Sequence, residues 1–331
     1  VEFMQLQSEE LLASVLAEIE RARATEDRDA LAASLFRMAT LYRQHGEPMK
    51  AITPLKELLA LQEETGDRHA MIPTLLLLGD LYRRQGGWHH ALALYDRACA
   101  MQEAAGDKTA MAATIGSMGV AYEGMEMWEE ALTTYRQSLS LKESLGDLVG
   151  VALIWNNIGN VEAKRRRFEE AFDSYGKSLA IQERAEDRLG QSMTLANLAS
   201  LHQHRGEWEE ATLRYRECLS LVGKEDPQRR AAALNGLGFV RKKTGDLEGA
   251  IAAYEEALRL LEASGDHLRS SVVLHNMALI HEERNEWRDA LRLMEQVISI
   301  DKRIGHPDMK QDMEVFRRIR SKLDAERDAH Q

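Results

Sequence analysis

The sequence predicts an all-α solenoid of seven helix hairpins with one further helix at each end. Landmark residues recur along the chain: Gly79 and Tyr95 return forty residues later as Gly119 and Tyr135. Apolar residues between these landmarks follow three-and-four spacing, which is typical of helices with one buried stripe. The chain of 331 residues contains only 5 prolines, which suits an almost entirely helical structure.

Residues 4–24 are expected to form an amphipathic N-terminal helix. Its apolar side holds Leu11, Leu12, Val15, Leu16 and Ile19. In repeat register this segment matches the second helix of a hairpin whose first helix is absent. It is interpreted as an N-terminal cap or as a half repeat of a longer chain. An unpaired apolar stripe there would also favour self-association through the chain end.

Residues 28–304 are expected to form the seven hairpins. Their predicted starts are Arg28, Arg68, Lys108, Leu148, Arg188, Gln228 and His267. Each start lies one or two residues after an aspartate, a strong N-cap because its side chain accepts from unpaired backbone amides. These aspartates are Asp27, Asp67, Asp107, Asp147, Asp187, Asp226 and Asp266. Gly66, Gly106, Gly146 and Gly265 are placed to end the preceding helices in a left-handed conformation.

A small residue recurs in the first helix of every hairpin, and an alanine follows it in the second helix. The first set is Ala39, Gly79, Gly119, Gly159, Ala199, Gly238 and Ala278, and the second is Ala51, Ala91, Ala131, Ala171, Ala211, Ala250 and Ala290. We interpret each pair as the close contact within a hairpin. The second helices open on Trp88, Trp128, Phe168, Trp208, Leu247 and Trp287, with Pro48 as an early helical residue in the first pair.

Two segments depart from the repeat. Gly223–Pro227 shortens the period by one residue, so an irregular junction is expected there. Residues 307–328 are expected to form a C-terminal capping helix. Its predicted apolar stripe is Met309, Met313, Phe316, Ile319 and Leu323, and arginines and a lysine coat the rest. A basic membrane-surface helix is the competing interpretation of that segment.

Composition excludes several functions. The formal net charge of −11 argues against general nucleic-acid binding, which needs a basic face. No apolar run is long enough to cross a membrane, so no membrane insertion is expected. Cys99 and Cys218 are interpreted as small buried residues of a protein in a reducing cytoplasm. Catalytic motifs are absent and the histidines lack ligand spacing, so no enzyme activity, cofactor or metal is expected.

The repeat resembles the tetratricopeptide repeat, with its Leu-Gly, Tyr, Gly-turn, Ala and Tyr/Phe landmarks. The longer helices and Gly-Asp turn are similar to the repeats of kinesin light chains, Leu-Gly-Asn spindle adaptors and bacterial peptide-sensing regulators. This resemblance implies one right-handed superhelical solenoid over residues 1–331, with a peptide bound along the wall of the first helices. Residues matching the family's groove positions are Arg37, Asp80, Arg83, Arg84, Asn156, Asn157, Asn160, Lys164, Asn197, His204, Asn235, Lys242, Lys243 and Asn276. The same mapping places Phe36, Arg43 and Glu123 on this wall.

Asparagines recur on this predicted wall. Asn157, Asn197 and Asn276 hold the same place in their repeats, although asparagine is a poor residue inside a helix. An amide donates and accepts, so it can bind the backbone of an extended peptide of any sequence. In the related adaptors, asparagines at this place grip a peptide backbone. The alternative is that these amides tie neighbouring helices together.

Lysine and arginine outnumber acidic residues on the predicted wall, although the whole chain is acidic. An acidic protein or peptide ligand is therefore expected. The sequence favours a non-enzymatic adaptor that binds such a ligand. A peptide-gated regulator and a self-associating scaffold are the alternatives.

Overall fold

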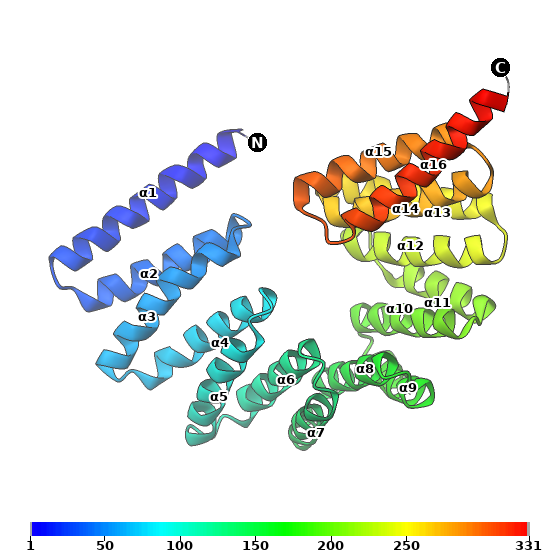
Figure 1. Cartoon of the computed structure of the whole chain (residues 1–331). Coiled ribbons are helices and arrows are strands. Elements are labelled where there is room, and N and C mark those ends of the chain that lie inside the picture. The colour runs from blue at the N-terminus through cyan, green and yellow to red at the C-terminus, as the bar shows by residue number, and fades with distance from the viewer. Residues whose placement is uncertain (1, 330–331) are drawn as a thin grey trace. The chain divides into compact units, whose positions relative to one another are not determined.

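The computed structural model describes the backbone of residues 2–329 and the side chains of residues 10–328. Within these limits the chain forms sixteen α-helices, one short 3₁₀ helix and no strand, which confirms the all-α repeat fold (Figure 1). Helix contacts divide the chain into an N-terminal unit, Val1–Arg165, and a C-terminal unit, Arg166–Gln331. A single solenoid that spans both units stays a prediction.

Each hairpin consists of a first helix, called an A helix, and a second helix, called a B helix. The A helices are α2 (Arg28–Gln44), α4 (Arg68–Arg84), α6 (Lys108–Gly124), α8 (Leu148–Lys164), α10 (Arg188–Arg205), α12 (Pro227–Lys243) and α14 (His267–Glu283). The B helices are α3 (Ile52–Thr65), α5 (Trp88–Ala104), α7 (Trp128–Leu145), α9 (Phe168–Arg184), α11 (Trp208–Leu221), α13 (Leu247–Ser264) and α15 (Trp287–Ile304). Helices α1 (Glu2–Ala24) and α16 (Met309–Ala329) flank them.

Aspartate caps set the starts of the A helices. Six of the seven begin at the predicted residue, and α12 begins one residue earlier, directly after its cap. All seven predicted aspartates accept a hydrogen bond from the backbone amide three residues on. The four predicted glycines have positive φ, and Glu26 and Glu186 take the same left-handed place where no glycine is present. Helix initiation is therefore encoded locally.

The first B helix has an irregular start. Pro48 lies at the beginning of a 3₁₀ helix, Pro48–Ala51, and α3 follows only at Ile52. The other six B helices begin as α-helices at the predicted aromatic residue or Leu247. The sequence predicts Pro48 as an early helical residue, which the structure confirms. It does not predict that this first turn is a 3₁₀ helix.

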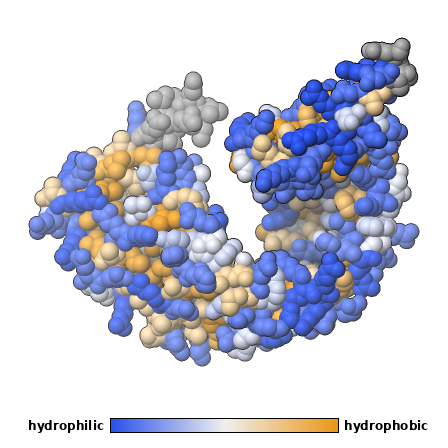
Figure 2. All heavy atoms as spheres, viewed as in Figure 1, coloured by the Kyte–Doolittle hydropathy of each residue, from blue (hydrophilic) through white to orange (hydrophobic). Residues whose placement is uncertain are grey.

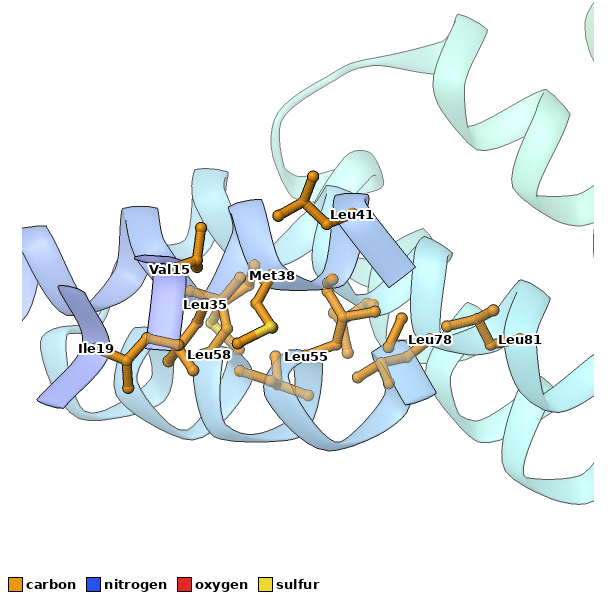
Figure 3. Close-up of a cluster of buried hydrophobic side chains, with 14 of the residues drawn as sticks. Val15, Ile19, Leu35, Met38, Leu41, Leu55, Leu58, Leu78 and Leu81 are labelled. Carbon is orange, nitrogen blue, oxygen red and sulfur yellow. The ribbon is translucent and has the colours of Figure 1, made fainter. Parts of the chain in front are cut away.

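Helix α1 packs one side against the first hairpin. Val15 and Ile19 are buried in a cluster with Leu35, Met38 and Leu58 (Figure 3). Leu11 and Leu16 are 40% and 50% exposed, so the predicted stripe is only partly covered. A helix has a single face toward its neighbour, and five apolar residues within nine positions spread wider than that face.

The glycines of the A helices contact tyrosine rings of the B helices. A Cβ built on Gly119 would lie 2.5 Å from Cε1 of Tyr135, and Gly79 and Gly238 face Tyr95 and Tyr254 in the same way. In these hairpins the small residue of the A helix accommodates the tyrosine ring sixteen positions on, and a close contact between the paired small residues stays a prediction. The paired alanines, such as Ala131, are fully buried.

We expect Gly119→Ala to destabilise the protein, although alanine is the better helix former by about 1 kcal/mol. The new methyl group must displace the Tyr135 ring, and overpacking of this kind costs about 1–3 kcal/mol. Gly176→Ala in α9 is the matched control, because a Cβ there meets nothing within 4 Å. The control should gain about 0.5–1 kcal/mol. Melting temperatures that move in the same direction for both variants would contradict this packing.

Ion pairs link consecutive repeats at a constant sequence interval. Arg165, Arg205 and Arg284, at or just after the ends of A helices, bind Glu129, Glu169 and Glu248 at the starts of the preceding B helices. The partners are 36 residues apart in each case, with N–O distances of 2.5, 3.2 and 2.8 Å. Arg318 within α16 binds Glu282 at 2.7 Å across the same interval, although Glu282 lies at the end of the A helix α14. No local sequence pattern predicts these pairs.

The buried face of α16 differs from the predicted stripe. Asp312, Val315, Ile319 and Leu323 are buried, whereas Met309 and Met313 are only half-buried. The buried Asp312 carboxylate contacts His275 of α14 and interacts with Asp301 of α15. A hydrophobic pattern does not predict such a residue.

Both cysteines are free thiols. Cys218 is fully buried, and burial raises its pKa to about 11, whereas Cys99 is half-buried. None of the helices within residues 2–329 combines the length and hydrophobicity that crossing a membrane requires.

Candidate peptide-binding wall

The predicted site residues lie on the A helices, and we call the side that carries them the A-helix wall. In the N-terminal unit α6 contacts α8, and in the C-terminal unit α12 contacts both α10 and α14. Successive A helices therefore stack directly on one another in these places. On the face seen in Figure 2, apolar side chains lie among polar ones over the N-terminal unit.

Two predicted cations at the start of the wall already have acidic partners. Arg37 binds Glu18 of α1 with Nη1–O distances of 2.9 and 3.1 Å. Arg83 lies 3.5 Å from Asp80, which also accepts a hydrogen bond of 2.7 Å from the Tyr95 hydroxyl. Burial and this carboxylate raise the pKa of Tyr95. The charges of both cations are therefore largely balanced.

The charge of Lys164 is also balanced by an acidic partner. Its Nζ lies 2.8 Å from Oε1 of Glu123, whose Oε2 accepts a hydrogen bond of 2.9 Å from the buried Tyr135 hydroxyl. The same Lys164 ammonium group lies 5.9 Å from the centre of the Trp128 ring. Lys164 thus contributes to stacking of α8 on the preceding hairpin.

Arg43 and Arg84 are exposed cations on the wall of the N-terminal unit. Neither forms an ion pair within the described residues. They line a surface hollow of ≈ 510 Å³ between α2 and α4, together with Thr40, Leu77 and Asp80. A guanidinium binds a carboxylate through two parallel hydrogen bonds. This hollow can therefore accept an acidic side chain or a carboxyl terminus.

The asparagines of α8 differ in their surroundings. Asn156 is buried, and both Asn156 and Asn160 interact with other groups of the chain. Asn157 is half-exposed, and its amide makes no side-chain hydrogen bond within the described part of the chain. Of these three residues, Asn157 is best placed to bind an external backbone.

In the C-terminal unit the asparagines are engaged within the protein. Asn276 Nδ2 donates to Asn235 Oδ1 at 3.0 Å, which joins α14 to α12. Asn197 of α10 also has an interaction partner in the chain, whereas His204 is exposed. The pair Asn235–Asn276 thus matches the alternative in which these amides tie helices together.

Lys242 lies near two acidic residues of α14, whereas Lys243 is exposed. Burial lowers the pKa of Lys242, and Lys243 lowers it further, although Glu283 and Glu282 oppose the change. Lys243 lies 5.5 Å from the centre of the Phe239 ring. Arg37, Arg83 and Lys164 are paired within the chain, so the wall is less positive than its residue count suggests. On the wall of the N-terminal unit, the cations without an ion pair among the described residues are Arg43 and Arg84.

The fold and this wall define a helical repeat scaffold. The tetratricopeptide repeat model matches residues 70–144, 150–223 and 229–303, and the chain belongs to this family. A second model, anaphase-promoting complex subunit 5, matches residues 7–85. No curated protein matches the chain.

Several solved structures share the fold. A tetratricopeptide repeat protein from Parabacteroides merdae is 17% identical and has a TM-score of 0.57, with 87% of this chain and 98% of that chain covered. The apo form of RapI is 15% identical and has a TM-score of 0.56, with 77% and 99% covered. A signal transduction ATPase with a tetratricopeptide repeat sensor from Pyrococcus horikoshii is 17% identical and has a TM-score of 0.65. That alignment covers 95% of this chain and 49% of the ATPase chain.

Tetratricopeptide repeats generally mediate protein–protein interactions and are generally non-catalytic scaffolds. Proteins are thus the class of partner that the family indicates for this chain.

Proposed function

We propose that this protein is an adaptor that binds an acidic peptide segment of a partner protein on the A-helix wall of its N-terminal unit. The observation that carries this proposal is the hollow between α2 and α4, where Arg43 and Arg84 have no ion-pair partner among the described residues. The neighbouring cations Arg37, Arg83 and Lys164 are paired within the chain. Charge that is not used for folding remains available for a ligand.

The backbone of the same peptide binds farther along the wall, at Asn157 of α8. Its half-exposed amide offers an NH₂ group that donates and an oxygen that accepts, which suits an extended backbone. A net hydrogen bond of this kind contributes about 0.5–1.5 kcal/mol. The acidic side chain of the peptide at the hollow determines which peptides bind. Asn157 adds affinity that does not depend on peptide sequence.

Selection of peptides from a random displayed library against the full chain tests this proposal. We expect the selected peptides to be rich in Asp and Glu. Arg43→Glu with Arg84→Glu should weaken their binding about tenfold or more at low salt, and less at high salt, because exposed charges are screened. Asn157→Ala should weaken binding about twofold to tenfold at either salt concentration.

Matched controls separate the wall from general charge effects. Arg136→Glu with Arg216→Glu makes the same charge change at exposed positions on B helices. Asn276→Ala removes an amide already paired with Asn235, so it should lower stability and leave binding to the N-terminal unit unchanged. Equal losses of affinity for wall and control variants would refute the proposal. A gated regulator or a scaffold that self-associates through a chain end would then be favoured.

A further inference from the structure

A buried polar cluster lies where α14, α15 and α16 of the C-terminal unit meet. Asp301 near the end of α15 is fully buried, and Asp312 in α16 is 6% exposed. His306 lies in the loop between them, after Gly305 turns the chain with φ of 68°. One ligand atom from each of Asp301, His306 and Asp312 lies within 4.8 Å of the other two.

Neighbouring side chains already orient both carboxylates. Ser271 Oγ of α14 donates to Oδ1 of Asp301 at 2.5 Å. Nδ1 of His275, one helical turn farther along α14, lies 2.5 Å from Oδ1 of Asp312. Carboxylates that bind metals are usually held by such hydrogen bonds from a second layer of residues. In each carboxylate these bonds occupy one oxygen.

The second oxygen of Asp301 is unusual. Asp301 is 0% exposed, and its Oδ2 atom has no hydrogen-bond partner. A buried carboxylate oxygen without a partner is costly, and a second carboxylate beside it adds repulsion. A cation bound between the two carboxylates removes both costs.

We propose that Asp301, His306 and Asp312 bind one divalent transition-metal ion of the zinc type. Two carboxylate oxygens and one imidazole nitrogen suit Zn²⁺ with water in its remaining position. Ligand atoms on one zinc ion lie about 3.3 Å apart, as bond lengths of about 2.0–2.2 Å in a tetrahedron require. The three ligand atoms now lie within 4.8 Å of one another, so zinc binding requires them to move closer, by a small movement of the His306 loop. Ca²⁺ fits less well because it takes six to eight oxygen ligands.

The His306 ring has a defined starting state. Its Nδ1 accepts from the Asp308 amide at 3.1 Å, so the proton of the neutral ring lies on Nε2. A cation at Nε2 moves this proton to Nδ1, and a cation at Nδ1 replaces the Asp308 contact. Either arrangement keeps the ring neutral and ties α16 to α15 through the metal.

The spacing explains why the sequence predicts no metal here. The three ligands come from two helices and a loop, so they form no motif with ligands one helical turn apart. Only the return of α16 onto α14 and α15 brings Asp312 to the other two.

Titration of the metal-free full chain with ZnCl₂ by calorimetry tests the site. We expect one high-affinity Zn²⁺ per chain, a higher melting temperature with zinc, and slower trypsin cleavage at Arg317 and Arg320 in α16. MgCl₂ and CaCl₂ at the same concentration should give no comparable shift. Asp301→Asn and His306→Ala should each lower zinc affinity at least tenfold.

Another histidine and a nearby aspartate provide the controls. His204→Ala and Asp308→Asn remove groups outside the ligand set and should leave zinc affinity unchanged. Asparagine at position 301 can still accept from Ser271, so Asp301→Asn without zinc should melt no lower than the parent. If that variant does not fold, His306→Ala decides, because it alters a loop residue. Absence of zinc binding, or zinc binding that persists in both ligand variants, would overturn the proposal.

Discussion

Tyr135→Ala should destabilise the N-terminal unit by about 3–5 kcal/mol, the cost of removing a large buried aromatic side chain. Tyr135 is 0% exposed, and its ring fills the space that Gly119 leaves open between α6 and α7. Alanine would leave a cavity bordered by Gly119, which has no side chain to fill it. Denaturant unfolding followed by circular dichroism measures the loss.

Tyr135→Phe separates the ring from its hydroxyl. It removes the hydrogen bond of 2.9 Å to the Glu123 carboxylate and keeps the packing, so the loss should be about 1.5–3 kcal/mol, the range for a hydrogen bond to a charged group. Glu123 retains its contact with Lys164 in this variant. If phenylalanine cost as much as alanine, the hydroxyl network rather than the ring would hold the hairpin together.

Ala131→Leu is expected to cost about 1–3 kcal/mol, because three extra carbons must enter a fully packed site. Ala131 is 0% exposed in α7, and the equivalent alanines of the other hairpins are buried to the same extent. The matched control is Ala104→Leu at the exposed end of α5. It adds the same atoms where solvent can accommodate them, so its melting temperature should stay close to that of the parent.

Equal melting temperatures for the two leucine variants would show that the alanine position is loosely packed. A drop for Ala104→Leu alone would place the tight contact on the outer side of the hairpin. Either result would contradict the assignment of Ala131 to the hairpin core.

The sequence predicts helix starts well because the signals are local. An aspartate caps a helix by accepting a hydrogen bond from the backbone amide three residues farther along, so it needs no distant partner. All seven predicted caps are present. The left-handed turns at Glu26 and Glu186 are harder to predict, because glutamate is not a residue that favours positive φ. At both places the chain closes the helix with local backbone hydrogen bonds: the amides of Glu26 and Glu186 donate to the carbonyls of Arg23 and Glu183.

The wall was predicted less completely than the fold. Residue type indicates a charge, but only the structure shows whether that charge is paired: Lys164 binds Glu123, which lies 41 residues away. The buried state of Asp312 also depends on contacts with His275, 37 residues away. Such pairings are set by how hairpins stack, and the repeat pattern of a single hairpin does not contain them.

The ion pairs between residues 36 positions apart affect how the repeats unfold together. In a repeat protein, stability is the sum of terms for each repeat and terms for each junction, and only the junction terms make neighbours melt together. The pairs of Arg165, Arg205 and Arg284 contribute to junction terms and are partly exposed to solvent. Added salt screens such pairs and leaves unaffected the apolar packing inside a hairpin, such as that of Tyr135 on Gly119. Ionic strength therefore tunes the cooperativity of unfolding, the sharpness of the transition, separately from the stability of a single hairpin.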